Sequence, residues 1–181
     1  PTTTFDNEAL YKDGKGPDEA EIARRRTLYF DPYHQAIAAE ITRLRQSHQA
    51  ITLYDCHSIR SIIPDLFDGT LPHFNIGTNE GKACDARLAN DIAALCAVSG
   101  LTHVVNGRFK GGYITRQYGR PNDGVHAVQM ELGCRAYIDE PLGPVDESNW
   151  PTPYSETYAA PVRATLTKIL ETCRDFARAQ S

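Results

Sequence analysis

Strand-like apolar runs alternate with helix-like segments along this chain. Strands are predicted over residues 50–55, 102–106 and 125–132, which are short apolar runs bounded by turn-forming residues. A helix is predicted over 83–98, ending at Ser99-Gly100, and a last helix over about 161–178. Because strands separated by helices pack as a sheet with covering helices, the pattern predicts an α/β fold.

The part of the chain before the first strand is predicted to be a loop followed by helix. Residues 1–17 have loop character, and Asp18 is expected to cap a helix with Glu21 as its capping-box partner. Asp31 and Pro32 then suit an N-cap and a first helical residue, so we expect two abutting helices or one kinked helix. Two further segments rich in proline or glycine are predicted to be loops, 58–82 and 139–155.

Composition restricts the classes of protein to which the chain can belong. It has 181 residues, 41% of them hydrophobic, which is enough for one domain with a buried core. The net charge of -4 argues against a nucleic-acid partner. No apolar run approaches the ~20 residues of a membrane span, so no membrane partner is expected. The five cysteines are scattered without a C-x-x-C pair, which is typical of reduced thiols in a cytoplasmic protein.

Asp55 and His57 are the first candidates for chemistry. They follow the apolar run 50–54, and because they are two apart in extended backbone, both side chains point to the same face. A carboxylate in that place can orient the imidazole ring or join it on a metal ion. The alternative is a structural histidine at the end of a strand. We favour the metal ligand because of the neighbouring Asp55.

The glycine-rich segment 106–116, NGRFKGGYITR, is the second candidate. Glycines allow the backbone to approach a ligand closely, and arginine forks bind carboxylates in a bidentate manner. The segment contains Arg108, Lys110 and Arg116, and a small anionic substrate with two carboxylates would use two such forks. Phe109 and Tyr113 favour a shaped pocket. The alternative is a solvated basic hairpin.

Glu131 is the third candidate. In the predicted strand 125–132, Gln129 and Glu131 share one face, and a carboxylate in a buried strand is costly unless it is paired. A buried carboxylate with a raised pKa suits a general base. An edge-strand glutamate paired with Arg135 or with an exposed lysine is an equally good interpretation of this spacing.

These pieces, in this order, resemble the N-formylglutamate amidohydrolase (N-formylglutamate deformylase) family. The matching segments are Pro32-Tyr33-His34, Leu53 to Ser58, Asn75-Ile76-Gly77-Thr78, the eleven residues 106–116, and Gln129-Met130-Glu131-Leu132. The resemblance covers about residues 1–140, and the eleven-residue segment is its most specific part. It implies zinc-dependent hydrolysis of N-formyl-L-glutamate to formate and L-glutamate, in histidine breakdown.

The resemblance also implies a fold and roles for single residues. The fold would be a mixed central sheet flanked by helices, similar to zinc carboxypeptidases. His57 would be a zinc ligand, and Glu131 would be the glutamate that activates water. The remaining implied residues would bind the substrate: Asn106, Arg108, Tyr113 and Arg116.

Family members carry an N-terminal portion that precedes anything matching Pro1 and holds an early histidine and an acidic residue of the zinc site. We therefore expect residues 1–181 to form a single α/β hydrolase-type domain that lacks this portion and has an incomplete zinc site. A bare sheet edge would favour a homo-oligomer. Two alternatives stay open: a domain that binds an acidic metabolite without metal, and a deacylase of another N-acyl amino acid.

Overall fold

The computed structural model describes residues 1–5 and 7–180. They form two compact units, one of residues 1–48 with 63–68, and one of residues 49–62 with 69 onward. All candidate site residues lie in the second unit. None of the helices among the described residues is both long enough and apolar enough to cross a bilayer. The predicted single domain stays a prediction.

The first unit contains the helices that precede the sheet. Asp18 caps α1 (Glu19–Arg25) as predicted, its Oδ1 accepting from the Glu21 backbone N–H at 2.8 Å. The reciprocal half of the expected capping box is wrong. The Glu21 carboxylate instead binds Arg24 and Arg25, at 2.6 Å and 2.7 Å, because both guanidinium groups lie on its face of the helix.

The predicted interruption at Pro32 is a change of helix type. A π-helical segment, η1 (Arg26–Phe30), connects α1 to α2 (Asp31–Arg45) without leaving the helical backbone region. Proline has no N–H to donate to the preceding turn, so Pro32 interrupts the regular i→i−4 bonding beside this segment. Asp31 is the first residue of α2, and its carboxylate accepts from Arg26 instead of capping the helix.

The second unit is built on a four-stranded mixed sheet of order β1-β4-β2-β3. The long strands β1 (Ile51–Ile59), at one edge, and β4 (Val125–Gly133), beside it, pair in parallel. Strand β2 (Phe74–Gly77) is antiparallel to β4 and parallel to β3 (His103–Val105). The predicted α/β class and the mixed sheet are confirmed.

Several predicted boundaries are wrong, each for a tertiary reason. Strand β1 continues past His57 to Ile59, because the register with β4 extends that far. Strand β2 lies inside the segment 58–82, for which a loop is predicted, since four residues are too few to show a period. Helix α4 (Tyr113–Tyr118) lies inside the glycine-rich segment, and α5 (Glu156–Arg178) begins before Pro161.

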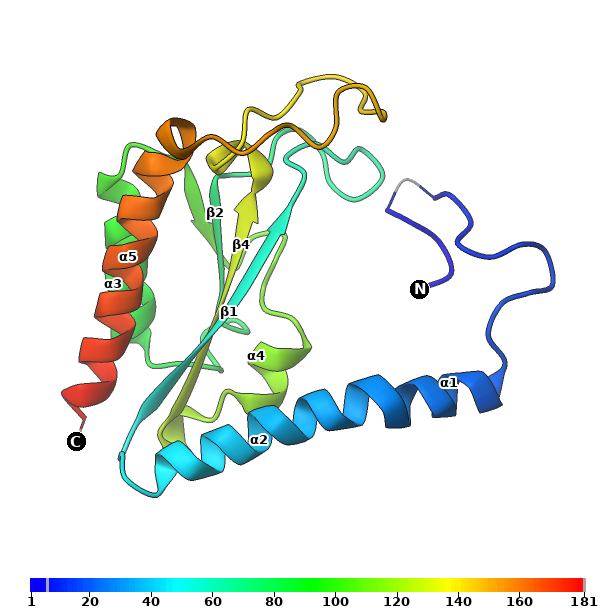
Figure 1. Ribbon diagram of the computed structural model, residues 1–181. Helices are drawn as coiled ribbons and strands as arrows, with labels where there is room; N and C mark the ends of the chain where they lie inside the picture. The colour runs from blue at the N-terminus through cyan, green and yellow to red at the C-terminus, as the bar shows by residue number, and fades with distance from the viewer. Residues whose placement is uncertain (6, 181) are drawn as a thin grey trace. The chain divides into compact units, whose positions relative to one another are not determined.

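Helices cover the two faces of this sheet unequally (Figure 1). Helices α3 (Ala86–Val98) and α5 lie together on one face, and the short α4 lies at the other. Two short 3-10 turns, Pro121–Asp123 and Cys134–Ala136, flank β4. The core lies between the sheet and α3 and α5, and its largest fully buried members are Phe74, Ile76, Leu88, Ile92, Met130 and Ile169. The opposite face is thereby left for polar side chains.

Neighbouring residues of α5 provide a test of this packing. Ile169 is fully buried in the core, whereas Leu170 is 50% exposed. Replacing Ile169 by Ala should lower the free energy of unfolding by about 3 kcal/mol, because it removes buried methylene groups and leaves a cavity. Leu170→Ala, the matched control, should cost well under half as much. Urea denaturation would measure both, and equal losses would contradict this placement of α5.

Candidate active site

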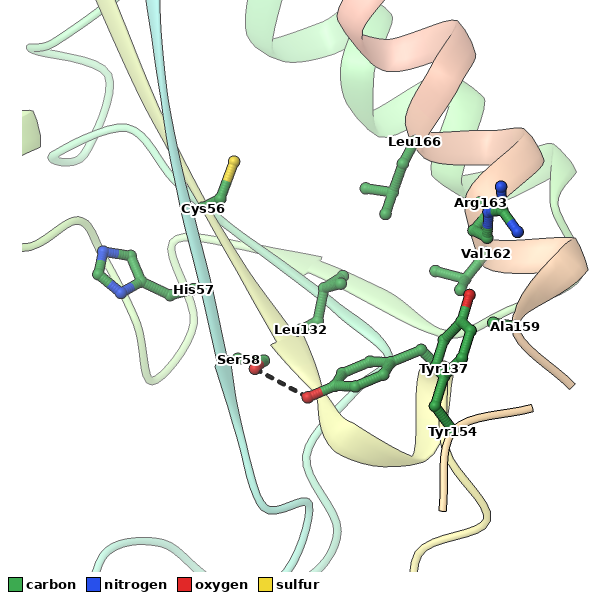
Figure 2. Close-up of a pocket in the computed structure, with 10 residues that line it drawn as sticks. All are labelled: Cys56, His57, Ser58, Leu132, Tyr137, Tyr154, Ala159, Val162, Arg163 and Leu166. Atoms are coloured by element: carbon green, nitrogen blue, oxygen red, sulfur yellow. Dashed lines mark hydrogen bonds between the residues drawn. The ribbon is translucent and has the colours of Figure 1, made fainter. Parts of the chain in front are cut away.

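The register of the paired strands β1 and β4 places His57 beside Glu131. His57 of β1 is the partner of Glu131 of β4, and paired residues on neighbouring strands point to the same face of a sheet. Met130 points the other way, into the core with α3 and α5. Figure 2 shows the His57 ring on the opposite side of β1 from the Cys56 side chain. His57 and Glu131 therefore share the sheet face that α3 and α5 leave open.

Asp55 holds the His57 ring from the same face. Its Oδ1 lies 3.0 Å from His57 Nε2, and its side chain is only 13% exposed while that of His57 is 48% exposed. A neutral imidazole that donates through Nε2 has its lone pair on Nδ1. The pair therefore presents Nδ1 as the ring nitrogen that can bind a metal ion or accept a proton. Asp55 Oδ2 is buried without a hydrogen-bond partner in the described structure.

Glu131 is a buried carboxylate in a strand with neighbours on both sides. It is 7% exposed, and burial raises the pKa of Glu131, an effect that nearby His57 and the Gln129 amide oppose. Pairing with Arg135, the alternative interpretation, is wrong. The Arg135 guanidinium instead donates to the Leu71 carbonyl at 2.8 Å, because it lies beyond the end of β4.

The glycine-rich segment is held against the sheet by backbone contacts. A Cβ at Gly77 of β2 would lie 2.5 Å from the Gly111 nitrogen, so only glycine permits this approach. Gly111 has φ of +112°, a backbone conformation that favours glycine over residues with a side chain. The Asn79 N–H donates to the Lys110 carbonyl at 2.6 Å, which ties the segment to the turn after β2.

The predicted substrate-binding residues divide into a structural and an exposed group. The Asn106 amide is engaged within the fold: its Oδ1 accepts from the Thr78 N–H at 2.9 Å, and its Nδ2 donates to the Thr78 hydroxyl at 2.8 Å. Arg108, Tyr113 and Arg116 are exposed. Arg116 Nη1 donates to the Gly111 carbonyl at 2.7 Å, which anchors that guanidinium group beside the segment.

Two buried polar residues near Glu131 were not predicted from the sequence. Gln129 is 5% exposed, and its Nε2 donates to Glu131 Oε2 at 3.2 Å. Asn75 is 1% exposed, and its Nδ2 donates to the Glu131 carbonyl at 3.0 Å. The alternation of Gln129 with Glu131 in one strand was the available signal, since two polar residues on one face of a buried strand are costly unless they interact. Asn75 had no such signal.

The described residues supply part of a set of metal donors. No group of three or more His, Cys, Asp or Glu side chains among them is arranged to hold a metal ion. The Asp55–His57 pair nevertheless has the form of a carboxylate-oriented histidine ligand, with Nδ1 available and a second carboxylate oxygen without a partner. These residues fit one part of a zinc site.

A pocket of about 340 Å³ lies on the other face of β1 (Figure 2). Its walls are mainly apolar and come from β1, the end of β4 and α5, and within it the Ser58 hydroxyl lies 2.9 Å from the Tyr137 hydroxyl. The His57 backbone borders this pocket, but the ring points away from it. The pocket is therefore separate from the face that carries Asp55, His57 and Glu131.

Comparison with known proteins identifies relatives over nearly the whole chain. The sequence model of the N-formylglutamate amidohydrolase family matches residues 1–138. The N-formylglutamate deformylase of Pseudomonas aeruginosa is 44% identical over 98% of this chain and 64% of its own length. That of Pseudomonas putida is 43% identical over 94% of this chain and 61% of its own length. The chain thus spans less than two thirds of these relatives.

A solved structure agrees on the fold. The crystal structure of N-formylglutamate amidohydrolase from Ralstonia eutropha JMP134 aligns with a TM-score of 0.71 and 23% identity. The alignment covers 90% of this chain and 56% of that chain. This arrangement of strands and helices is therefore one that a longer protein also adopts.

The burial of Glu131 predicts a pH-dependent stability. Because its pKa is raised in the folded state, the native chain binds this proton more tightly than the unfolded chain does. Its contribution to stability is thus present at low pH and is lost as pH rises through the folded pKa. Glu131→Gln should stabilise the chain at pH 7 relative to wild type, and by less at pH 4.

Thermal unfolding at both pH values would measure this difference. Glu171→Gln is the control, because Glu171 is exposed on α5 and its charge stays hydrated. Its unfolding temperature should follow that of wild type at both pH values. A stabilisation by Glu131→Gln that is larger at pH 4 than at pH 7 would contradict a raised pKa for this carboxyl group.

Proposed function

Because the chain belongs to the N-formylglutamate amidohydrolase family, we propose that it forms the part of an N-formylglutamate deformylase that carries the general base and the substrate-binding arginines. The reaction is hydrolysis of N-formyl-L-glutamate to formate and L-glutamate. The relatives of this chain from two Pseudomonas species are named N-formylglutamate deformylase. One structural observation supports the proposal above others: the buried Glu131 and the carboxylate-held His57 are register partners on the sheet face opposite α3 and α5.

Glu131 acts as the general base. Its carboxylate takes a proton from the attacking water as the new C–O bond forms at the formyl carbon. It then delivers that proton to the glutamate nitrogen as the C–N bond breaks. Burial raises the pKa of Glu131, which brings the acid closer to the proton affinity that both transfers need at neutral pH. General acid–base catalysis of this kind increases the reaction rate by about 10²- to 10⁴-fold.

Arg108 and Arg116 bind the two carboxylates of the substrate. Both are exposed on the segment that packs against β2 and β4, and both carry a guanidinium fork that matches a carboxylate. Tyr113, 47% exposed at the first turn of α4, is the aromatic side chain of this segment that we assign to contact with the substrate. Asn106 contributes by holding the turn after β2, through its bonds to Thr78.

His57 Nδ1 is proposed to bind zinc, with Asp55 orienting the ring. Zinc would polarise the formyl carbonyl when bound. A catalytic zinc takes three protein ligands, so further ligands would have to join His57. A zinc-carboxypeptidase-like fold, a homo-oligomeric state and a cytoplasmic location stay predictions.

Release of the free amino acid from a substrate series tests the proposal. The full-length protein should hydrolyse N-formyl-L-glutamate with a higher kcat/KM than N-formyl-L-glutamine, N-formyl-L-aspartate or N-acetyl-L-glutamate. Loss of the side-chain carboxylate should cost about 10²-fold or more, because a guanidinium group is left without its partner. Equal rates with the glutamine and glutamate substrates would exclude the two-carboxylate clamp. Absence of any formate release would reject the function.

Glu131→Gln isolates the role of the base. It should lower kcat for N-formyl-L-glutamate by about 10²- to 10⁴-fold, because an amide cannot take the proton of water. Bound zinc, measured by elemental analysis, should equal that of wild type. Glu171→Gln provides the control for removing a surface charge and should keep wild-type turnover. Retained turnover in Glu131→Gln would remove this residue from its role.

A further inference from the structure

We infer that Gln129 is a positioning residue that couples the glycine-rich segment to Glu131, an inference that rests on the proposed function for its catalytic meaning. One polar atom of the Gln129 side chain bonds to the glycine-rich segment, and the other bonds to Glu131. Its Oε1 accepts from the Gly112 backbone N–H at 2.5 Å, and its Nε2 donates to Glu131 Oε2 at 3.2 Å.

The orientation of the Gln129 amide follows from hydrogen-bond chemistry. The Gly112 N–H can only donate, so the amide oxygen must face it. The amide NH₂ then faces Glu131, whose ionised carboxylate can only accept. A flipped amide would place two donors together at Gly112 and two acceptors together at Glu131. The two contacts therefore select one orientation.

Burial makes this connection costly to break. Gln129 is 5% exposed and Glu131 is 7% exposed, so water cannot readily replace either bond. A buried polar group that loses its partner costs about 1–3 kcal/mol. Gly112 is also the N-cap residue of α4, where a backbone N–H has no acceptor within the helix. Gln129 thus supplies the acceptor that this amide lacks.

The same connection limits where the segment can sit. A Cβ at Gly112 would lie 3.1 Å from Gln129 Oε1, and the neighbouring Gly111 already contacts β2 at Gly77. A displacement of the segment would therefore break the bond to Gln129. Arg108 and Arg116 lie on either side of Gly112 in this segment. Their position when they bind substrate is thus linked to the carboxylate oxygen that Gln129 holds.

The bond from Gln129 to Glu131 Oε2 makes the two oxygens of the proposed base unequal. With Oε2 accepting from Gln129, Oε1 is the less engaged oxygen, and we assign it to take the proton of water. Gln129 therefore selects one carboxylate oxygen and restricts rotation of the carboxylate group. Its effect on the reaction is through Glu131 and the segment, without contact to the reacting atoms.

Two substitutions separate the two bonds. Gln129→Glu keeps an oxygen facing the Gly112 N–H but places a carboxylate against Glu131. It should keep KM for N-formyl-L-glutamate within about 3-fold of wild type and lower kcat by about 10-fold or more. Gln129→Met, similar in length, removes both bonds. It should lower kcat and also raise KM by about 10-fold or more, because the arginine-bearing segment is released.

The control is Gln117→Met in α4, an exposed glutamine that makes no part of the proposed site. It should keep wild-type kcat and KM. A merely structural role for Gln129 would lower activity in both variants only in proportion to the folded fraction, with KM unchanged. That result, or wild-type kinetics in Gln129→Met, would overturn the inference.

A measurement that does not depend on turnover distinguishes failure of this inference from failure of the proposed function. Amide hydrogen exchange followed by NMR should show Gly112 protected in the wild-type protein and in Gln129→Glu, and exchanging about 10-fold faster or more in Gln129→Met. An unprotected Gly112 in wild type overturns the inference even if both variants fail to fold. Protection without any formate release keeps the link and rejects the proposed function.

Discussion

The parallel pairing of β1 with β4 is the constraint on which the candidate site depends. It extends through nine residue pairs, and near its end His57 faces Glu131. A shift of one residue would move Glu131 into the core beside α3 and α5, where no donor is provided for it. The register is kept by the apolar residues of the other face, Val128 and Met130, which are buried in the core. Core packing thereby determines which side chains meet on the open face.

The burial of Glu131 costs free energy and also raises the proton affinity of its carboxylate. A carboxylate in a central strand loses hydration, and the structure offsets this with one amide donor from Gln129 and a nearby imidazole. The compensation is partial, which leaves the pKa of Glu131 raised. Partial compensation suits the general base proposed here, which takes up a proton and then gives it away. A fully paired carboxylate would be more stable and a weaker base.

Close contacts between glycines fix the position of the glycine-rich segment 106–116. Because Gly77 and Gly111 bring two backbones together without side chains between them, the segment lies close enough for Gly112 to reach Gln129. The segment thus becomes part of the sheet surface. Its exposed arginines are carried on a backbone that is fixed at its base, which favours a defined spacing between the charges they present.

Local sequence determined the long helices, three of the strands and the identity of the chemical groups. The apolar period of α3 and α5, the capping Asp18, and the alternation of Asp55 with His57 depend only on neighbours in the chain, so they could be predicted. Strand β2 and helix α4 could not, because each is short and is stabilised by pairing or packing with distant residues. Tertiary structure alone decided that Glu131 is central, that Arg135 is not its partner, and that Asn75 of another strand bonds to it. The physical reason is that hydrogen-bond partners across a sheet are selected by strand order and register, which no local pattern encodes.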